Sequence, residues 1–151
     1  MKNTMLEMTR YAALARQAVA EGVVLLKNEA VLPLAPGGRA ALFGYAQFHY
    51  YKSGTGSGGL VNVTHVPNLP EILGGDGGYR LDAEVQARYV AWLADHPYEM
   101  GTGWAQEPWF QPEMPLDEKF VRAAAQRADT AFIVIGRTAG EDQDNTNTPG
   151  S

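Results

Sequence analysis

The segment that most constrains the fold lies near the end of the chain, where a short apolar run leads into glycine and acidic residues. Residues 131–135 read Ala-Phe-Ile-Val-Ile, and three of the five are β-branched. Such a run is typical of a strand buried on both faces of a parallel sheet. Open α/β sheets bind ligands at the carboxyl ends of their strands. The sequence therefore places Glu141, Asp142 and Asp144 where an α/β protein carries out its chemistry.

Hydrophobic spacing and capping residues predict that helices and strands alternate along the rest of the chain. Asp82 and Asp117 are each suited to cap a following helix, as Thr9 is near the start, and Asn28 is suited to end the first helix. The predicted helices span residues 9–27, 68–73, 82–94 and 117–127, and the predicted strands span residues 40–43, 79–81 and 131–135. This order predicts an α/β fold with a mostly parallel sheet flanked by helices. A long loop is expected over residues 95–115.

Composition excludes several classes of protein. The chain has 151 residues, of which 45% are hydrophobic and 19% charged, as expected of one globular domain. The net charge is -5 and the 12 Lys and Arg residues are scattered, which argues against a nucleic-acid partner. Without cysteine there is no disulfide and no thiolate metal site. No signal peptide or membrane-spanning run is visible, so we expect a soluble cytoplasmic protein that does not contact a membrane.

A glycine-rich segment, Gly54–Gly59, formally matches the dinucleotide-binding pattern G-x-G-x-x-G. That site needs its glycines directly between a strand and a helix, whereas the preceding strand is expected to end near Gly44. The segment is open to three interpretations: a nucleotide site, a flexible loop, or a loop over a ligand. In the last of these, hydrogen bonds to the ligand would come from Lys52, Ser53 and Ser57.

Aromatic residues could form platforms for sugar rings. The candidates are the segment 48–51, which reads Phe-His-Tyr-Tyr, together with Trp104 and Trp109. The alternative is that these side chains belong to the core or to an interface. The three histidines have no metal-like spacing, and we expect neither a metal nor a cofactor.

The acidic residues are the sharpest candidates for catalysis. Glycoside hydrolysis needs two carboxyl groups, one protonated and one ionised. A glutamic acid close to other carboxylates has a raised pKa, which suits a general acid, and Glu141 is placed for that role. The alternatives are a solvated acidic loop and a divalent cation site.

Three segments together resemble the second, α/β-sandwich domain of glycoside hydrolase family 3, which contains many β-glucosidases and β-xylosidases. Residues 15–29, followed by Leu-Pro-Leu at 32–34, are similar to the opening of that domain. Residues 39–44 are similar to its first strand. Residues 131–137 with 140–144 are similar to its Gly-Glu-Gly-x-Asp-Arg loop, with Asp142 in place of the second glycine and Asn145 in place of the arginine.

The resemblance implies roles for residues of that loop. The family's catalytic acid/base matches Glu141, and its loop aspartate matches Asp144, expected near the substrate with Lys52, Ser53, Ser57 and Trp104. The family's nucleophile is an aspartate of a separate (β/α)8 barrel, for which this chain has no sequence. Residues 1–151 are therefore expected to form a single, partial α/β-sandwich domain, of the type in which this domain precedes the barrel.

We expect the chain to be part of a β-glycosidase that hydrolyses O-glycosidic bonds and to be inactive alone, with the barrel supplied in cis or in trans. Its partners would be a carbohydrate substrate, the barrel and, through an uncovered strand 131–135, a second copy of itself. The rival hypotheses are a noncatalytic carbohydrate-binding or interaction module and a nucleotide-binding α/β domain.

Overall fold

The computed structural model describes residues 7–50, 56–59, 63–102, 106, 108, 110–137 and 141. Within it the chain forms two compact units, residues 1–34 and 35–151, which are considered separately. The helices α1 to α4 span Met8–Gly22, Leu69–Gly74, Ala83–Asp95 and Glu118–Arg127. The strands β1, β2 and β3 span Arg39–Phe43, Arg80–Leu81 and Thr130–Ile133, and the 3-10 helices η1 and η2 span Tyr45–Gln47 and Gly56–Gly59.

The first unit is built on α1, which ends earlier than its sequence predicts. The helix stops at Gly22, and Val23 is already extended, whereas the apolar spacing predicts helix as far as residue 27. Val23 and Val24 are β-branched and largely exposed, so within this unit no burial offsets their weaker helix propensity. Asn28 does not cap the helix. Its Oδ1 instead accepts hydrogen bonds from the backbone N–H groups of Val31 and Leu32, both at 3.1 Å, and so closes a turn.

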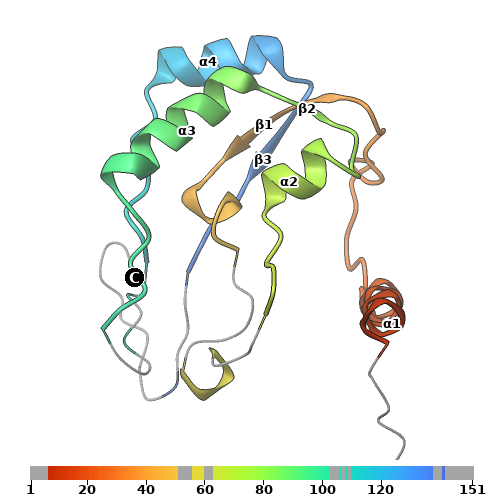
Figure 1. The fold of residues 1–151 in the computed structure, drawn as a ribbon. Coiled ribbons are helices and arrows are strands. Elements are labelled where there is room, and N and C mark those ends of the chain that lie inside the picture. Colours follow the sequence, from red (N-terminus) through yellow and green to blue (C-terminus); the bar gives the residue numbers. More distant parts are fainter. Residues whose placement is uncertain are drawn as a thin grey trace, which may run out of the picture. The chain divides into compact units, whose positions relative to one another are not determined.

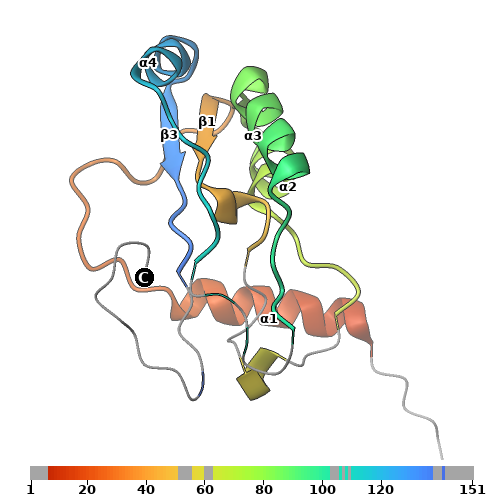
Figure 2. The same cartoon turned by 90° about the vertical axis from the view of Figure 1, so that its left-hand side faces the viewer.

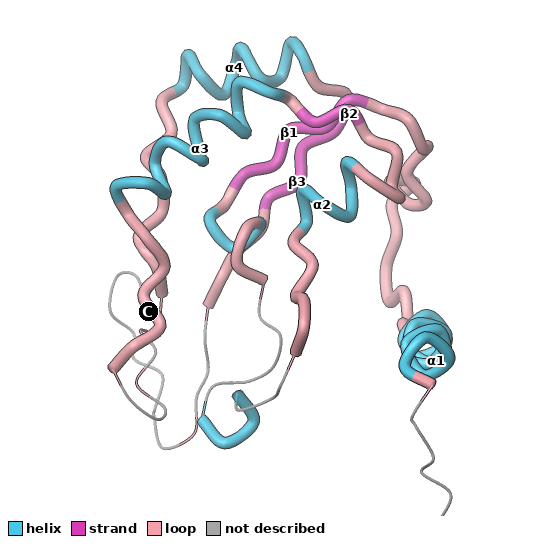
Figure 3. The backbone as a smooth tube through the Cα atoms, viewed as in Figure 1, coloured by secondary structure: helices cyan, strands magenta, loops and turns pink. Residues whose placement is uncertain are grey.

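The second unit is a three-stranded parallel sheet in the order β2-β1-β3, as the alternation of elements predicts. Phe43 at the end of β1 pairs with Ile133 at the end of β3, so the carboxyl ends of both strands lie together. This end of the sheet is its carboxyl edge, as distinct from the lateral edge formed by an outermost strand. Helices α3 and α4 lie on one face and α2 on the other (Figures 1 and 2). The segments that follow β1 and β3 leave the sheet from that same carboxyl edge (Figure 3).

The core lies between the sheet and the pair of helices α3 and α4. Ala41 and Phe43 of β1 pack there against Val85 and Tyr89 of α3. Phe120 and Ala124 of α4 and Met114 of the preceding loop complete the cluster. The apolar positions of each helix are three or four residues apart, which places them on one face.

Strand β3 differs from its prediction. Its composition predicts burial on both faces, but Ile133 is 74% exposed and Ile135, just beyond the strand, is 86% exposed. Two features account for the difference. β3 is an edge strand with β1 as its partner, and α3 and α4 cover the sheet over β1 rather than over the end of β3.

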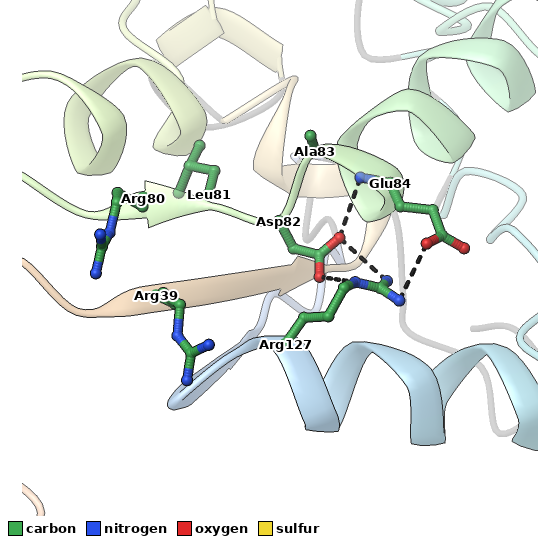
Figure 4. A pocket seen from close by; sticks show the side chains of 7 residues that line it. All are labelled: Arg39, Arg80, Leu81, Asp82, Ala83, Glu84 and Arg127. Atoms are coloured by element: carbon green, nitrogen blue, oxygen red, sulfur yellow. Dashed lines mark hydrogen bonds and ion pairs between the residues drawn. The ribbon is translucent and has the colours of Figure 1, made fainter.

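Asp82 joins the ends of two helices to the sheet (Figure 4). Its carboxylate caps α3 by accepting hydrogen bonds from the N–H groups of Glu84 and Val85 at 3.1 and 3.0 Å. It also accepts from Arg127, in the last turn of α4, at 2.7 Å, and Arg127 reaches Glu84 at 3.0 Å. The negative charge of Asp82 lies at the N-terminus of α3 and the positive charge of Arg127 at the C-terminus of α4, so each interacts favourably with the dipole of its helix. The relative orientation of α3 and α4 is thereby fixed beside the amino ends of β1 and β3, where β2 ends.

Candidate functional site

The carboxyl edge of the sheet is shaped by Gly44, which follows β1. Its φ is 100°, and an added Cβ would stand 1.9 Å from the carbonyl oxygen of Val134. The N–H of Val134 donates to the carbonyl of Phe43 at 2.8 Å, so the pairing of the two strands continues to this point. The close approach of the backbones excludes any other residue at position 44. The segments that leave β1 and β3 therefore begin side by side.

A buried polar network holds the turn that follows β1. The side chain of Gln47 is fully buried, and its Nε2 donates to the carbonyls of Leu42 and Gly44 at 3.1 and 2.9 Å. Its Oε1 accepts from Gln86 of α3 at 2.9 Å. Because each polar atom of this amide has a partner, the network fixes the direction in which the chain leaves the sheet. Sequence reasoning did not identify Gln47.

Two titratable side chains, Tyr89 and Glu113, meet the backbone at the same edge. The hydroxyl of Tyr89 accepts from the N–H of Gly44 at 2.7 Å, and the carboxylate of Glu113 accepts from the N–H of Tyr45 at 2.9 and 3.1 Å. Burial raises the pKa of Glu113, although the hydrogen bond from Tyr45 works against the rise. Burial also raises the pKa of Tyr89. An open cavity of about 640 Å³ adjoins both groups and reaches Ile133 and Arg137.

Glu141 and Ser57, which lie 84 residues apart in the sequence, are in direct contact. The Glu141 atom Oε2 accepts a hydrogen bond from the Ser57 hydroxyl at 2.7 Å and another from the Ser57 backbone N–H at 3.0 Å. Ser57 lies in η2, after β1 in the sequence, and Glu141 follows β3. Both side chains are exposed.

The pKa of Glu141 is lowered from its ordinary value, which is the reverse of the sequence-based expectation. The cause is first the backbone N–H of Ser57 and then its hydroxyl, since both stabilise the ionised carboxylate. The expectation assumed a neighbouring carboxylate that would disfavour the charge. Among the described residues no carboxylate contributes to this pKa.

Of the other site residues predicted from the sequence, the structure describes only Ser57. Lys52, Ser53, Trp104 and Asp144 lie outside the described residues. Ser57, predicted to hydrogen-bond a substrate, donates hydrogen bonds to Glu141 in the structure, and its contact with a substrate stays a prediction. Within the described ranges there is no cluster of three His, Asp or Glu side chains that could hold a metal ion.

The aromatic segment contributes to packing more than to an open platform. Phe48 packs against the core, with its ring centroid 6.2 Å from that of Tyr89. His49 stacks on Tyr98, with ring centroids 4.9 Å apart, and burial lowers the pKa of its imidazole. Tyr50 is exposed. The core interpretation therefore fits Phe48, whereas His49 and Tyr50 are exposed.

The glycine-rich segment lacks the arrangement of a dinucleotide site. β1 ends at Phe43, well before Gly56–Gly59, and those residues form a 3-10 helix. The α-helix that comes next in the described part of the chain begins at Leu69. The phosphate-binding geometry requires glycines between a strand and the helix directly after it. We therefore set the nucleotide-binding hypothesis aside.

No helix among the residues described is both long and apolar enough to cross a membrane.

The family model and the sequence relatives that match the chain indicate the same class of protein. Its residues 23–150 match the model of the glycosyl hydrolase family 3 C-terminal domain. It is 48% identical over 146 residues to a β-glucosidase of Ruminococcus albus, a match that covers 97% of the chain and 15% of the relative. It is 39% identical over 140 residues to β-glucosidase A of Butyrivibrio fibrisolvens, covering 89% of the chain and 16% of the relative.

Solved structures of β-glucosidases share the fold. The enzyme from Paenibacillus barengoltzii superposes with a TM-score of 0.83 at 45% identity, over 93% of this chain and 15% of that one. β-Glucosidase 3B from Thermotoga neapolitana, solved with glucose, superposes with a TM-score of 0.80 at 31% identity, over 97% and 20% of the two chains. The chain thus spans about a sixth of the length of the curated relatives. With its parallel α/β sheet and its match over residues 23–150, the chain belongs to glycoside hydrolase family 3, through that family's C-terminal domain.

Proposed function

We propose that the chain is the part of a β-glucosidase that supplies the general acid/base, and that Glu141 is that residue. The observation that carries the proposal is the contact of Glu141 with Ser57. This contact holds one oxygen of the exposed Glu141 carboxylate, and it brings together the segments that follow β1 and β3. The proposal is supported by the β-glucosidase relatives and by the match of residues 140–144 to the family's acidic loop.

Hydrolysis with retention requires a second carboxylate, the nucleophile, which the family carries on its barrel. The two carboxyl groups would be about 5–5.5 Å apart. An ionised nucleophile at that distance raises the pKa of the acid/base. It would oppose the lowering by Ser57 and keep Glu141 protonated until the leaving oxygen takes the proton. Glucose, the ligand bound by the Thermotoga neapolitana enzyme, indicates the class of sugar expected at the site.

A chimeric enzyme tests the proposal. This chain would replace the matching segment of the Ruminococcus albus β-glucosidase, with which it is 48% identical. The chimera should hydrolyse nitrophenyl and alkyl β-glucosides, whereas the 151-residue chain alone should hydrolyse neither, because a positioned general acid contributes only about 10²–10⁴-fold.

Glu141→Gln in the chimera should reduce kcat most on alkyl glucosides, whose poor leaving groups need protonation, and least on nitrophenyl glucosides. Glu118→Gln, at an exposed carboxylate of α4, is the matched control and should leave kcat unchanged. Equal losses on both substrates would assign Glu141 a structural or binding role. Turnover by the isolated chain that Glu141→Gln abolishes would show that no second carboxylate is needed, and the proposal would fail.

A further inference from the structure

The two hydrogen bonds between Ser57 and Glu141 fall on the same oxygen of the carboxylate. Both the hydroxyl and the backbone N–H of Ser57 donate to Oε2, at 2.7 and 3.0 Å. Among the described residues no donor reaches Oε1. Within the described part of the chain the two oxygens of Glu141 are therefore not equivalent: Oε2 has two donors, whereas Oε1 has none and can carry a proton.

Two donors on one oxygen also restrict the rotation of the carboxyl group. A single hydrogen bond leaves the group free to turn about it, but donors that come from the backbone and the side chain of the same residue define a direction. The donors are preorganised, since one belongs to the backbone of η2 and the other is attached to that backbone through a single Cβ. Preorganised hydrogen bonds contribute to catalysis by holding a reacting group in its productive geometry.

We propose that Ser57 is the positioning residue of Glu141, which anchors Oε2 and leaves Oε1 as the atom that donates and accepts the proton. The inference rests on the proposed function. In the first step the proton passes from Oε1 to the leaving oxygen as the bond from that oxygen to the anomeric carbon breaks. In the second step Oε1 takes a proton from water as the water oxygen bonds to the anomeric carbon and the nucleophile's carboxylate departs.

The anchor keeps Glu141 in the protonation state that the second step requires. Ser57 stabilises the ionised form of Glu141, which is the form that must accept a proton from water. Once the nucleophile is esterified it has no charge, so it no longer opposes the lowering of the Glu141 pKa by Ser57. Among the described residues, Ser57 is the partner that the carboxylate faces, and no charged group contributes.

The contact is tested on the 151-residue chain by NMR titration, without any measurement of activity. We expect the carboxyl carbon of Glu141 to titrate below its ordinary pKa and the amide proton of Ser57 to respond with the same midpoint. Ser57→Ala should move the Glu141 midpoint upward, and Ser57→Thr, which keeps the hydroxyl, should restore it. Thr102→Ala removes a hydroxyl bonded instead to Gln106 and should leave the midpoint unchanged.

The role in catalysis is tested in the chimera. Ser57→Ala should lower kcat about tenfold, as expected for the loss of one hydrogen bond to a charged group, and shift the pH profile upward. Ser57→Thr should recover both. A raised KM with kcat and pH profile unchanged would mean that Ser57 binds the sugar, and the inference would be overturned.

The two proposals fail in distinguishable ways. An amide of Ser57 that does not respond to the titration of Glu141, or a midpoint unmoved by Ser57→Ala, overturns the positioning role whatever the activity. Glu141→Gln without effect on the chimera overturns the proposed function, whatever the NMR titration shows.

Discussion

Removing the carboxylate of Asp82 should destabilise the second unit more than any change at an exposed ion pair. Only 3% of the side chain is exposed, and it serves as both the N-cap of α3 and the partner of Arg127 in α4. Loss of an N-cap costs about 1 kcal/mol. Because Arg127 is 37% exposed, its pair with Asp82 contributes about 1–2 kcal/mol rather than the value for a fully buried pair. We therefore expect Asp82→Ala to lower the free energy of unfolding by about 2–3 kcal/mol.

Two further variants separate the contributions. Asparagine is as good a cap as aspartate but has no charge, so Asp82→Asn should lose only the pair with Arg127, about 1–2 kcal/mol. The matched control is Glu118→Ala, which removes an exposed pair with Arg122 within one helix and should cost about 0.3–0.5 kcal/mol. Urea denaturation followed by far-UV circular dichroism would measure all three changes.

Two results would refute this reasoning. If Asp82→Ala unfolds at the same urea concentration as Glu118→Ala, then Asp82 does not join the two helices in solution. If Asp82→Asn is as destabilising as Asp82→Ala, then the hydrogen bonds to Glu84 and Val85 contribute nothing, and the stabilisation comes from the charge alone.

Further predictions concern the carboxyl edge of the sheet. Tyr89→Phe leaves the N–H of Gly44 without its 2.7 Å acceptor and should cost about 1–3 kcal/mol of unfolding free energy in urea titrations; a cost within error of zero would mean that water replaces the hydroxyl. Gly44→Ala places a Cβ against the carbonyl of Val134 and should abolish the cooperative thermal transition. The raised pKa of Glu113 implies a contribution to stability that is present below its unfolded pKa and lost as pH rises through the folded pKa, so urea titrations at several pH values should show this loss in the wild type and not in Glu113→Gln.

The starts of α2, α3 and α4 were predictable because the signal is local, whereas Thr9, predicted to cap the first helix, lies inside α1. Asn68, Asp82 and Asp117 each accept a hydrogen bond from an N–H within the following turn, and each of their helices begins at the next residue. The end of α1 was not predictable from periodicity, because apolar residues continue at helical spacing through Leu26 while the helix stops at Gly22.

The candidate site was predictable only in part, because its contacts join distant segments. Glu141 is identifiable from its place after an apolar strand, but its partner Ser57 is 84 residues away and was assigned to substrate binding. Glu113 and Gln47 carry no periodic or motif signal, and their roles follow from burial at the edge of a folded sheet. The pKa of Glu141 was predicted in the wrong direction because the two hydrogen bonds from Ser57, which stabilise the carboxylate, leave no signal in the sequence.

Strand β3 carries the last prediction, which is that the chain self-associates. One side of the strand pairs with β1. No described strand pairs with its other side, which forms a lateral edge of the sheet. Ile133 and Ile135 are 74% and 86% exposed beside that edge. An apolar edge strand is a template for pairing with another chain, and burial of each Ile side chain is worth roughly 1.5–3 kcal/mol. Sedimentation velocity should therefore show association that increases with protein concentration.

Charges at the exposed edge should prevent that association without unfolding the chain. The double variant Ile133→Lys, Ile135→Lys should sediment as a monomer, and its thermal midpoint should change little because both side chains are exposed in the folded unit. Val90→Lys is the matched control: Val90 is 58% exposed on α3, away from the strand edge, and its substitution should leave association intact. A wild-type chain that stays monomeric at every concentration would show that the edge of β3 is protected, and that the exposed isoleucines do not act as an interface.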